Sequence, residues 1–542
     1  MDTKIARIIH DEFGIETDVQ LSRPEPQFGD YATNVALQLA GSLGKPPREI
    51  AEQLAEKLRQ VDDFAEVTVA GPGFINLHLS DTNLLALTHQ KPRPKKSGQT
   101  TVIETNNPNP FKAMHIGHAF NAVLGDTIAN LLAVDGAQVH RVSYHGDVGL
   151  HVGKSMRSLL HYVDGNADKL NEIPEAERNT FMSRMYSEGS LAYKEDEGAK
   201  TEIDGLARES FSPQSEIYKQ VYTICKTWSF EQIDQIVALL GNQPIERRFL
   251  ESEADAIGVR TVKANVPAVF KESNGALIFE GSKYGSFDNA FVAGNGRGLY
   301  GARDLGLMQL KNDAFHAEKS YIATAEEQRD YFKGVIAAAE LCLPELKGVT
   351  VNISTGTVKL STGKMSSRDG DVIEIAWLFD QFKDAIRARD GEPTDEIVAG
   401  ALRYQFLRVK IGSDVVFDIN EAVSLTGNTG SYLQYAHARA RRILEKISGP
   451  IETPKVINSE DRALVRKLGE YHEVVETAVS SLEPHHVCNY LFELAQEFNR
   501  YYEKNHVLGS DHEQHRAGLV ALYADTLKAG LSILGIVAPE KM

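Results

Sequence analysis

The stretch NPFKAMHIGHAFNAVLGD, residues 109–126, decides the fold because it leads from a predicted strand into a predicted helix. Before it, TVIET at 101–105 is β-branched and apolar, as is typical of a buried strand. Apolar residues at helical spacing then predict a helix over 118–134, and AQVHRVSYH at 137–145 predicts the next strand. A strand, a helix and a second strand in this order form a βαβ unit, which indicates a parallel sheet.

Two histidines stand at the start of this predicted helix. A helix that follows a parallel strand directs its free N–H groups and positive dipole end into the crevice at the sheet's carboxyl edge, where a phosphate binds well. His115 and His118 are three residues apart, so both can reach one ligand and donate hydrogen bonds to phosphate oxygens. Gly117 has no Cβ and lets a ring or a phosphate approach the backbone. Two histidines alone are more often ordinary polar loop residues, so this interpretation depends on the rest of the chain.

The composition is that of an ordinary globular protein of several domains. The 542 residues are 42% hydrophobic and 25% charged, and this length predicts two to four domains. No apolar run reaches the roughly 18 residues of a transmembrane helix, and the start lacks a secretory hydrophobic region, so we expect a cytoplasmic protein without membrane contact. Cys225, Cys342 and Cys488 lie far apart without a CxxC pair, and we expect neither a disulfide framework nor a bound metal.

The net charge of −17, taken alone, argues against a nucleic-acid partner. The charge is unevenly distributed, however. HARARRILEK at 437–446 carries Arg439, Arg441 and Arg442, and KPRPKK at 91–96 holds four basic residues. A charged stripe is more often a solvated helix face than a binding surface, so charge alone leaves RNA contact open.

The chain divides by pattern into three domains and a linker. Residues 1–88 are predicted to form a small α/β domain, and the Pro-rich basic segment 89–100 a linker. Residues 101–393 are predicted to form a Rossmann-like parallel-sheet domain with a mostly helical insertion at about 155–265. Long amphipathic helices over 394–542 predict an α-helical bundle. The expected fold class is therefore multidomain α/β.

A second motif lies far downstream of the first. VTVNISTGTVKLSTGKMSS at 349–367 has the character of a hairpin with turn signals, and STGKMSSRDGDV at 361–372 is rich in Gly and Ser. Its Lys364 is a point charge suited to closing over a triphosphate. His-Ile-Gly-His after the first strand, followed in this order by Lys-Met-Ser-Ser, resembles the class I aminoacyl-tRNA synthetases.

Further segments resemble one family within that class, the arginyl-tRNA synthetases, over nearly the whole chain. They match its N-terminal domain, which helps bind the tRNA elbow, its ATP-site signature, its arginine-binding segment and its anticodon-binding helical domain. The matching segments are FGDYATNVALQLA (28–40), VAGPGFINLHLS (69–80), ETNNPNPFKAMHIGH (104–118), GLYGARDLG (298–306), GALRYQFLRVKIGSDVVFDI (400–419), GSYLQYAHARARRIL (430–444) and LSILGIVAPEKM (531–542).

The resemblance implies a set of site residues. The catalytic residues would be His115, His118 and Lys364. The ATP site would comprise Pro108, Asn109, His115, Gly117, His118, Lys364, Met365, Ser366 and Ser367. Arginine would be bound by Asn34, Glu104, Asn109, Tyr300, Asp304 and Gln328, and tRNA by Arg439, Arg441 and Arg442. It also implies L-arginine, ATP with Mg²⁺ as its counter-ion, and the tRNA for arginine as partners of a monomer.

The residue chemistry agrees with an arginine site. A guanidinium fork calls for carboxylates in bidentate geometry. Glu104 ends the first predicted strand, and Tyr300 and Asp304 are four residues apart, so one helical turn presents both to one side. Without the family match, Tyr300 and Asp304 would be interpreted as a core tyrosine beside a helix-terminal acid.

The segment SYHGDVGLHVG, 143–153, departs from the family pattern. The family usually has Asn at its start, then Asp-Trp-Gly, then Gln, whereas Ser143, Val148 and His151 stand at these positions here. The sequence does not assign a role to His151.

Three functions are compatible with the first motif. The resemblance implies an enzyme that forms arginyl-adenylate from ATP and arginine and transfers the arginyl group to tRNA. The alternatives are a catalytically silent tRNA-binding paralogue and another nucleotidyltransferase with the same loop, such as a cysteine ligase. The retained His115, His118 and Lys364 favour the active enzyme over the first alternative. The cysteine spacing and the C-terminal bundle disfavour the second, which would need zinc ligands.

Overall fold

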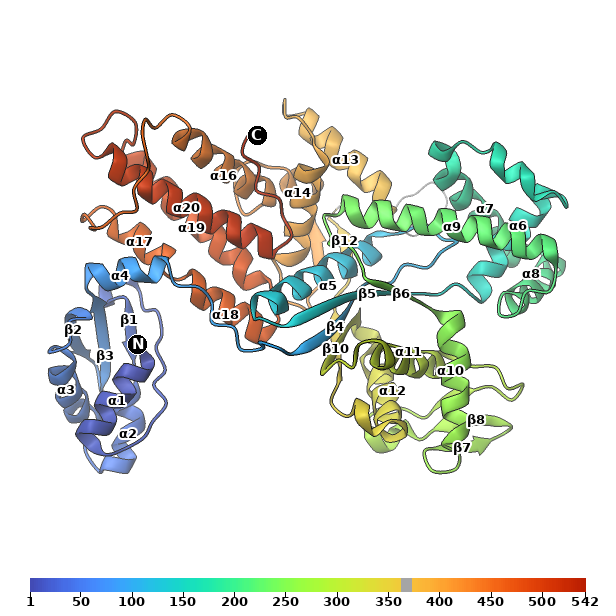
Figure 1. The fold of residues 1–542 in the computed structure, drawn as a ribbon, viewed down its shortest axis with the longest axis horizontal. Helices are drawn as coiled ribbons and strands as arrows, with labels where there is room; N and C mark the ends of the chain where they lie inside the picture. Colours follow the sequence, from blue (N-terminus) through green and yellow to red (C-terminus); the bar gives the residue numbers. More distant parts are fainter. Residues whose placement is uncertain (362–372) are drawn as a thin grey trace.

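The computed structural model describes residues 1–361 and 373–542. At its centre lies a parallel sheet of five strands in the order β11-β10-β4-β5-β6 (Figure 1). The strands are β4 (Thr100–Asn106), β5 (Gln138–His145), β6 (Arg247–Leu250), β10 (Lys319–Ala325) and β11 (Thr350–Thr355). The predicted parallel sheet is therefore confirmed.

Helix α5 (Ile116–Val134) connects β4 to β5 and packs closely on β4. Most of its residues are buried, because it lies between the sheet and the C-terminal helices. A Cβ on Gly125 would lie 2.9 Å from the carbonyl oxygen of Glu104 and 3.0 Å from Cα of Thr105. Glycine at this position therefore sets the close approach of the helix to the central strand.

Four helices form the insertion between β5 and β6, with a hydrophobic core of their own. They are α6 (Leu150–Val163), α7 (Glu175–Glu195), α8 (Glu197–Glu209) and α9 (Glu216–Leu239). The predicted range 155–265 also contains β6 and α10 (Glu251–Ala264), which belong to the sheet domain. β6 escapes sequence detection because it is a short edge strand in which Phe249 alone is buried.

The second half of the sheet domain contains α11 (Tyr300–Phe315), α12 (Arg329–Cys342) and a small antiparallel sheet. That sheet consists of β7 (Phe270–Ser273), β8 (Ala276–Phe279) and β9 (Asn289–Val292). The hairpin predicted over 349–367 is wrong in the part of that segment that the structure describes. Its first half, β11, joins the main sheet, and its second half, β12 (Val358–Leu360), pairs in parallel with β13 (Val415–Phe417). Gly356 allows this change of sheet, because a Cβ there would collide with the backbone of Ser413.

The N-terminal domain is an α/β unit at one end of the molecule (Figure 1). Its antiparallel sheet has the order β1-β3-β2. Arg23 of this domain pairs with Glu473 at 2.9 Å, and Asp30 accepts a hydrogen bond from Arg462 at 2.6 Å. The elements are α1 (Asp2–Phe13), β1 (Tyr31–Thr33), α2 (Val35–Leu43), α3 (Pro47–Leu58), β2 (Phe64–Ala70), β3 (Phe74–Leu79) and α4 (Asp81–Thr88).

The C-terminal part of the chain is helical, as predicted. Its long helices pack on one another and on α5. The helices are α13 (Ile375–Arg387), α14 (Asp395–Leu407), α15 (Ile419–Ala422), α16 (Gly430–Leu444), α17 (Arg462–Leu468), α18 (Tyr471–Ser481), α19 (His485–Lys504) and α20 (Glu513–Ile533).

One fully buried guanidinium joins the helical part to the sheet domain. Arg403 of α14 donates to a carboxylate oxygen of Asp126, in the middle of α5, at 2.9 Å. It also donates to the carbonyl of Leu240 at 3.0 Å, to Oδ1 of Asn242 at 2.7 Å and to the carbonyl of Leu534 at 2.8 Å. A buried charge is tolerated when its donors are satisfied in this way.

Replacing Asp126 with alanine should therefore destabilise the protein by about 3–5 kcal/mol, because it leaves the Arg403 charge buried without a counter-charge. Equilibrium unfolding in urea measures the change. The matched control is Asp384→Ala, which breaks an exposed pair with Arg387 and should change stability by less than about 1 kcal/mol. Equal changes in the two variants would show that the buried pair is unimportant.

Candidate active site

The two histidines of the first motif lie together at the N-terminus of α5. His115 is the N-cap residue, and its backbone N–H donates to Nδ1 of His118 at 3.3 Å. The two rings stack with their centroids 3.7 Å apart. A Cβ on Gly117 would lie 3.2 Å from the His115 ring, so the glycine also makes room for this stack.

Both rings are neutral at neutral pH. Burial lowers the pKa of His115 to about 4 and that of His118 to about 3, and the nearby Lys112 acts in the same direction. A neutral imidazole still carries one N–H donor. The helix start therefore offers donors and the positive end of the α5 dipole to an anion without charged side chains of its own.

The chain that follows the second motif contacts this helix start. Lys364, Met365, Ser366 and Ser367 lie outside the described residues. The chain that follows them is described again from Ile373, whose carbonyl accepts a hydrogen bond from the N–H of Ile116 at 2.9 Å. Glu374 forms a bridge with His115. The segment directly after the second motif is therefore hydrogen-bonded to the first motif.

Hydrogen bonds hold the loop between β4 and α5 against the end of β5. His145 Nδ1 lies 2.5 Å from the carbonyl oxygen of Pro108, and the N–H of Gly146 donates to Oδ1 of Asn109 at 3.0 Å. These contacts place Pro108 and Asn109, both predicted site residues, at the carboxyl edge of the sheet.

The insertion supports the same loop. Phe111 is buried and has a φ of 64°, an unusual backbone conformation for a bulky residue. Its N–H donates to Ser229 of α9 at 3.0 Å, and its carbonyl accepts from Ser155 of α6 at 2.9 Å. Its ring stacks on Tyr222. The helices α6 and α9 therefore hold the loop that carries the first motif.

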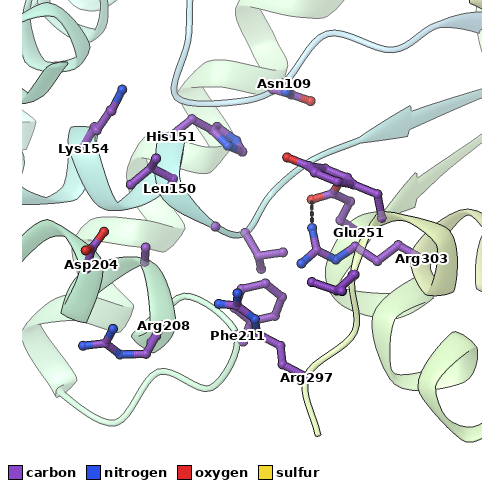
Figure 2. A pocket seen from close by; sticks show the side chains of 15 residues that line it. Asn109, Leu150, His151, Lys154, Asp204, Arg208, Phe211, Glu251, Arg297 and Arg303 are labelled. Carbon is purple, nitrogen blue, oxygen red and sulfur yellow. Dashed lines mark hydrogen bonds and ion pairs between the residues drawn. The ribbon is translucent and has the colours of Figure 1, made fainter. Parts of the chain in front are cut away.

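A cavity of about 600 Å³ opens between the insertion helices and the α10–α11 pair (Figure 2). Two of the residues predicted to bind arginine, Asn109 and Tyr300, line it. Glu251 lines it as well, and this carboxylate was not found from the sequence. Arg303 lies beside it, with its guanidinium 3.4 Å from Glu251 and 3.1 Å from Asp255.

Glu251, which lines the cavity, and Asp304 of α11, which is not among the lining residues, are both poorly stabilised as anions. Burial raises the pKa of Glu251 to about 7, although the neighbouring Arg303 opposes the shift. Burial raises the pKa of Asp304 to about 6, although the Tyr331 hydroxyl donates to it at 2.5 Å. A bound cation would favour the ionised form of both groups.

The other predicted arginine contacts are placed differently. Glu104 forms a buried ion pair with Lys311 at 2.6 Å and accepts from Asn107 at 2.7 Å, so its charge is already balanced. Gln328 is exposed and follows the carboxyl end of β10. Asn34 is the N-cap of α2 in the N-terminal domain and bonds Gln38, so the structure does not bring it to the cavity.

The residues that depart from the family pattern fill or line the site. Ser143 is buried and bonds Nε2 of His145 at 2.8 Å. Val148 is buried against the cavity, and His151 lines it with Nε2 2.7 Å from the carbonyl oxygen of Gly146.

The predicted tRNA-binding arginines lie on α16. Arg439 and Arg442 are exposed, whereas Arg441 forms an ion pair with Glu540 at 2.7 Å. Within the described ranges, no cluster of His, Cys, Asp and Glu is arranged to hold a metal ion, and no helix is long and apolar enough to cross a membrane.

The fold and the site together define a class of protein. A parallel sheet whose central strand leads into a helix that begins with His-Ile-Gly-His is the catalytic arrangement of the class I aminoacyl-tRNA synthetases. Three family models match the chain: the arginyl tRNA synthetase N-terminal domain over 1–79, the class I (R) tRNA synthetase catalytic domain over 81–400 and the DALR anticodon binding domain over 433–542. The chain belongs to the arginyl-tRNA synthetase family.

Relatives match along the whole chain. It is 27% identical to an arginine–tRNA ligase of Bdellovibrio bacteriovorus, over 99% of this chain and 97% of that one. It is 28% identical to an arginine–tRNA ligase of Frankia casuarinae, with the same coverage. The arginyl-tRNA synthetase structure of Thermus thermophilus has the same fold, with a TM-score of 0.81 at 24% identity, over 100% of this chain and 99% of that one.

The buried histidines predict an acid-sensitive fold. Burial lowers the pKa of His145 to about 3, whereas the ring in the unfolded chain takes up a proton near pH 6.5. Its contribution to stability is therefore complete above pH 6.5 and is lost as the pH falls from there toward 3. Unfolding in urea at several pH values should show that, as the pH falls, the free energy of unfolding decreases less in His145→Asn than in the wild type. The exposed His10→Asn serves as the control and should keep the wild-type slope. A His145→Asn slope equal to the wild type would contradict the expectation.

Proposed function

We propose that this protein joins L-arginine to its tRNA at the expense of ATP, through an arginyl-adenylate. The observation that carries the proposal is the juxtaposition of two opposite binding environments. The α5 N-terminus with His115 and His118 suits an anion, and the neighbouring cavity with Glu251 suits a cation. A cationic amino acid that reacts with a triphosphate needs both.

At the anion end, the triphosphate of ATP lies against the α5 N-terminus. His115 and His118 donate hydrogen bonds to its oxygens, and Lys364 of the second motif supplies the positive charge that they lack. Mg²⁺ accompanies ATP as its counter-ion. An oxygen of the arginine carboxylate attacks the α-phosphorus, and the bond to pyrophosphate breaks. A ribose hydroxyl of the terminal tRNA adenosine then attacks the arginyl carbonyl and releases AMP.

At the cation end, Asp304 and Glu251 are the carboxylates best suited to arginine. Both are held in surroundings that raise their pKa, so a guanidinium or ammonium group recovers part of the lost stabilisation. Glu104 lies in the same buried group but is neutralised by Lys311, so it shapes the site through Asn107. Tyr300 is 70% exposed and stands at the cavity, where its ring can cover the substrate.

The remaining partners follow from the same proposal. The exposed arginines of α16 contact the tRNA through its phosphates. The enzyme acts as a monomer in the cytoplasm, where its product serves protein synthesis.

Asp304→Asn tests the arginine end. Loss of this charge should raise the KM for arginine by roughly two to three orders of magnitude, as expected for one partner of a buried charge pair, while the KM for ATP changes little. The measurement is aminoacylation with varied arginine at saturating ATP and tRNA. Asp313→Asn, an exposed substitution on the same helix, is the control. An unchanged KM for arginine would mean that Asp304 is structural.

The α16 surface makes a separate prediction. Replacing Arg439 and Arg442 with Gln, while keeping Arg441 because it holds Glu540, should raise the KM for tRNA and reduce its dependence on salt. Aminoacylation at several salt concentrations measures both effects. Substituting the exposed Arg387 in the same way provides a control for general charge. If the salt dependence stays at its wild-type value, this face is merely solvated.

A further inference from the structure

Three polar side chains from different elements converge on Gly146, in the turn between β5 and α6. Asn109 Oδ1 accepts from its N–H at 3.0 Å, and Nε2 of His151 lies 2.7 Å from its carbonyl oxygen. A Cβ on Gly146 would lie 3.2 Å from Oε2 of Glu251. Because the glycine has no side chain, Asn109 and Glu251 can approach its backbone, and Asn109, His151 and Glu251 all line the cavity (Figure 2).

The contact with Gly146 fixes the tautomer of His151. A carbonyl oxygen only accepts hydrogen bonds, so Nε2 carries the hydrogen. Burial lowers the pKa of His151 to about 4, and the ring is therefore neutral at neutral pH. Its other nitrogen, Nδ1, is then a bare acceptor.

The groups around Nδ1 indicate what this acceptor can bind. No described residue forms a hydrogen bond with Nδ1 of His151. Nδ1 is also not one of the buried side-chain atoms that lack a hydrogen-bond partner. The ring points into the cavity, toward Glu251. Lys154, three residues further along α6, turns away, with its ammonium 5.2 Å from the centre of the Tyr193 ring. Nδ1 is therefore an acceptor in the wall of the cavity that Glu251 also lines, where the guanidinium of Arg303 is already paired with Glu251 and Asp255.

An acceptor beside a carboxylate selects a ligand group that donates hydrogen bonds and carries positive charge. We infer that Nδ1 of His151 accepts a hydrogen bond from a cationic N–H group of the bound arginine, next to Glu251. This assignment rests on the proposed function, because it names a contact in the same cavity. It also gives a role to a residue at which the chain departs from its family, where Gln is usual.

The α-ammonium and the guanidinium of arginine share this chemistry, and two analogues distinguish them. 5-Guanidinopentanoate lacks the α-amino group, and L-citrulline has a neutral end in place of the guanidinium. Calorimetric titration of the full chain with arginine and with each analogue measures the affinities of the wild type, His151→Leu and His151→Gln. ATP affinity and urea unfolding report whether the fold is intact.

His151→Leu should weaken arginine binding roughly ten- to a hundredfold, as expected for a hydrogen bond to a charged group. His151→Gln should stay within a few fold of the wild type, because its amide can donate to Gly146 and accept from the ligand. The analogue that lacks the contacted group should bind the wild type and His151→Leu equally, which also identifies the end of arginine that is held.

Two results would overturn the inference. One is an unchanged affinity of His151→Leu for arginine. The other is an equal loss for arginine and both analogues, which would reduce His151 to a support for Gly146. Failure of the wild type itself to bind and transfer arginine would instead refute the proposed function, so the two failures are distinguishable.

Discussion

The buried guanidinium of Arg403 is the contact on which the arrangement of the domains depends. Each of its five N–H donors meets an acceptor, and these acceptors come from α5, from the end of α9 and from the last turn of α20. Because Asp126 lies in the middle of α5 and His115 caps the start of that helix, the C-terminal bundle and the two histidines of the first motif are attached to one helix.

Burial disfavours the charged forms of four ionisable side chains in the site. His115 and His118 are neutral because burial disfavours their protonated forms, and Asp304 and Glu251 are weakened acids for the same physical reason. A bound anion beside the histidines favours their protonated forms, and a bound cation beside the carboxylates favours their ionised forms. Such a site gains more from a ligand with both charges than from a neutral one, which is a route to discrimination between amino acids without a separate proofreading step.

Elements in which buried apolar residues recur at regular spacing within one segment could be predicted from the sequence. The βαβ unit and the terminal bundle were predicted correctly for this reason. It was insufficient for 247–250, where burial of Phe249 alone leaves no periodic pattern, and for 349–360, whose two strands join different sheets. The same limit applies to the site. Its contiguous first motif was recognisable, whereas Glu251 reaches the cavity only because α10 packs on α11, a contact between distant segments that no local signal encodes.

The pairing of Asp126 with Arg403 also has a consequence for the order of folding. A growing chain exposes α5 long before α14 is made, and the carbonyl of Leu534, which completes the acceptor set, follows Arg403 by 131 residues. Until then, Asp126 lacks its main counter-charge, and the apolar residues of α5 lack the C-terminal helices with which they share a core. The sheet domain therefore reaches its final packing only after Leu534 has been made, and until then the chain is most exposed to aggregation.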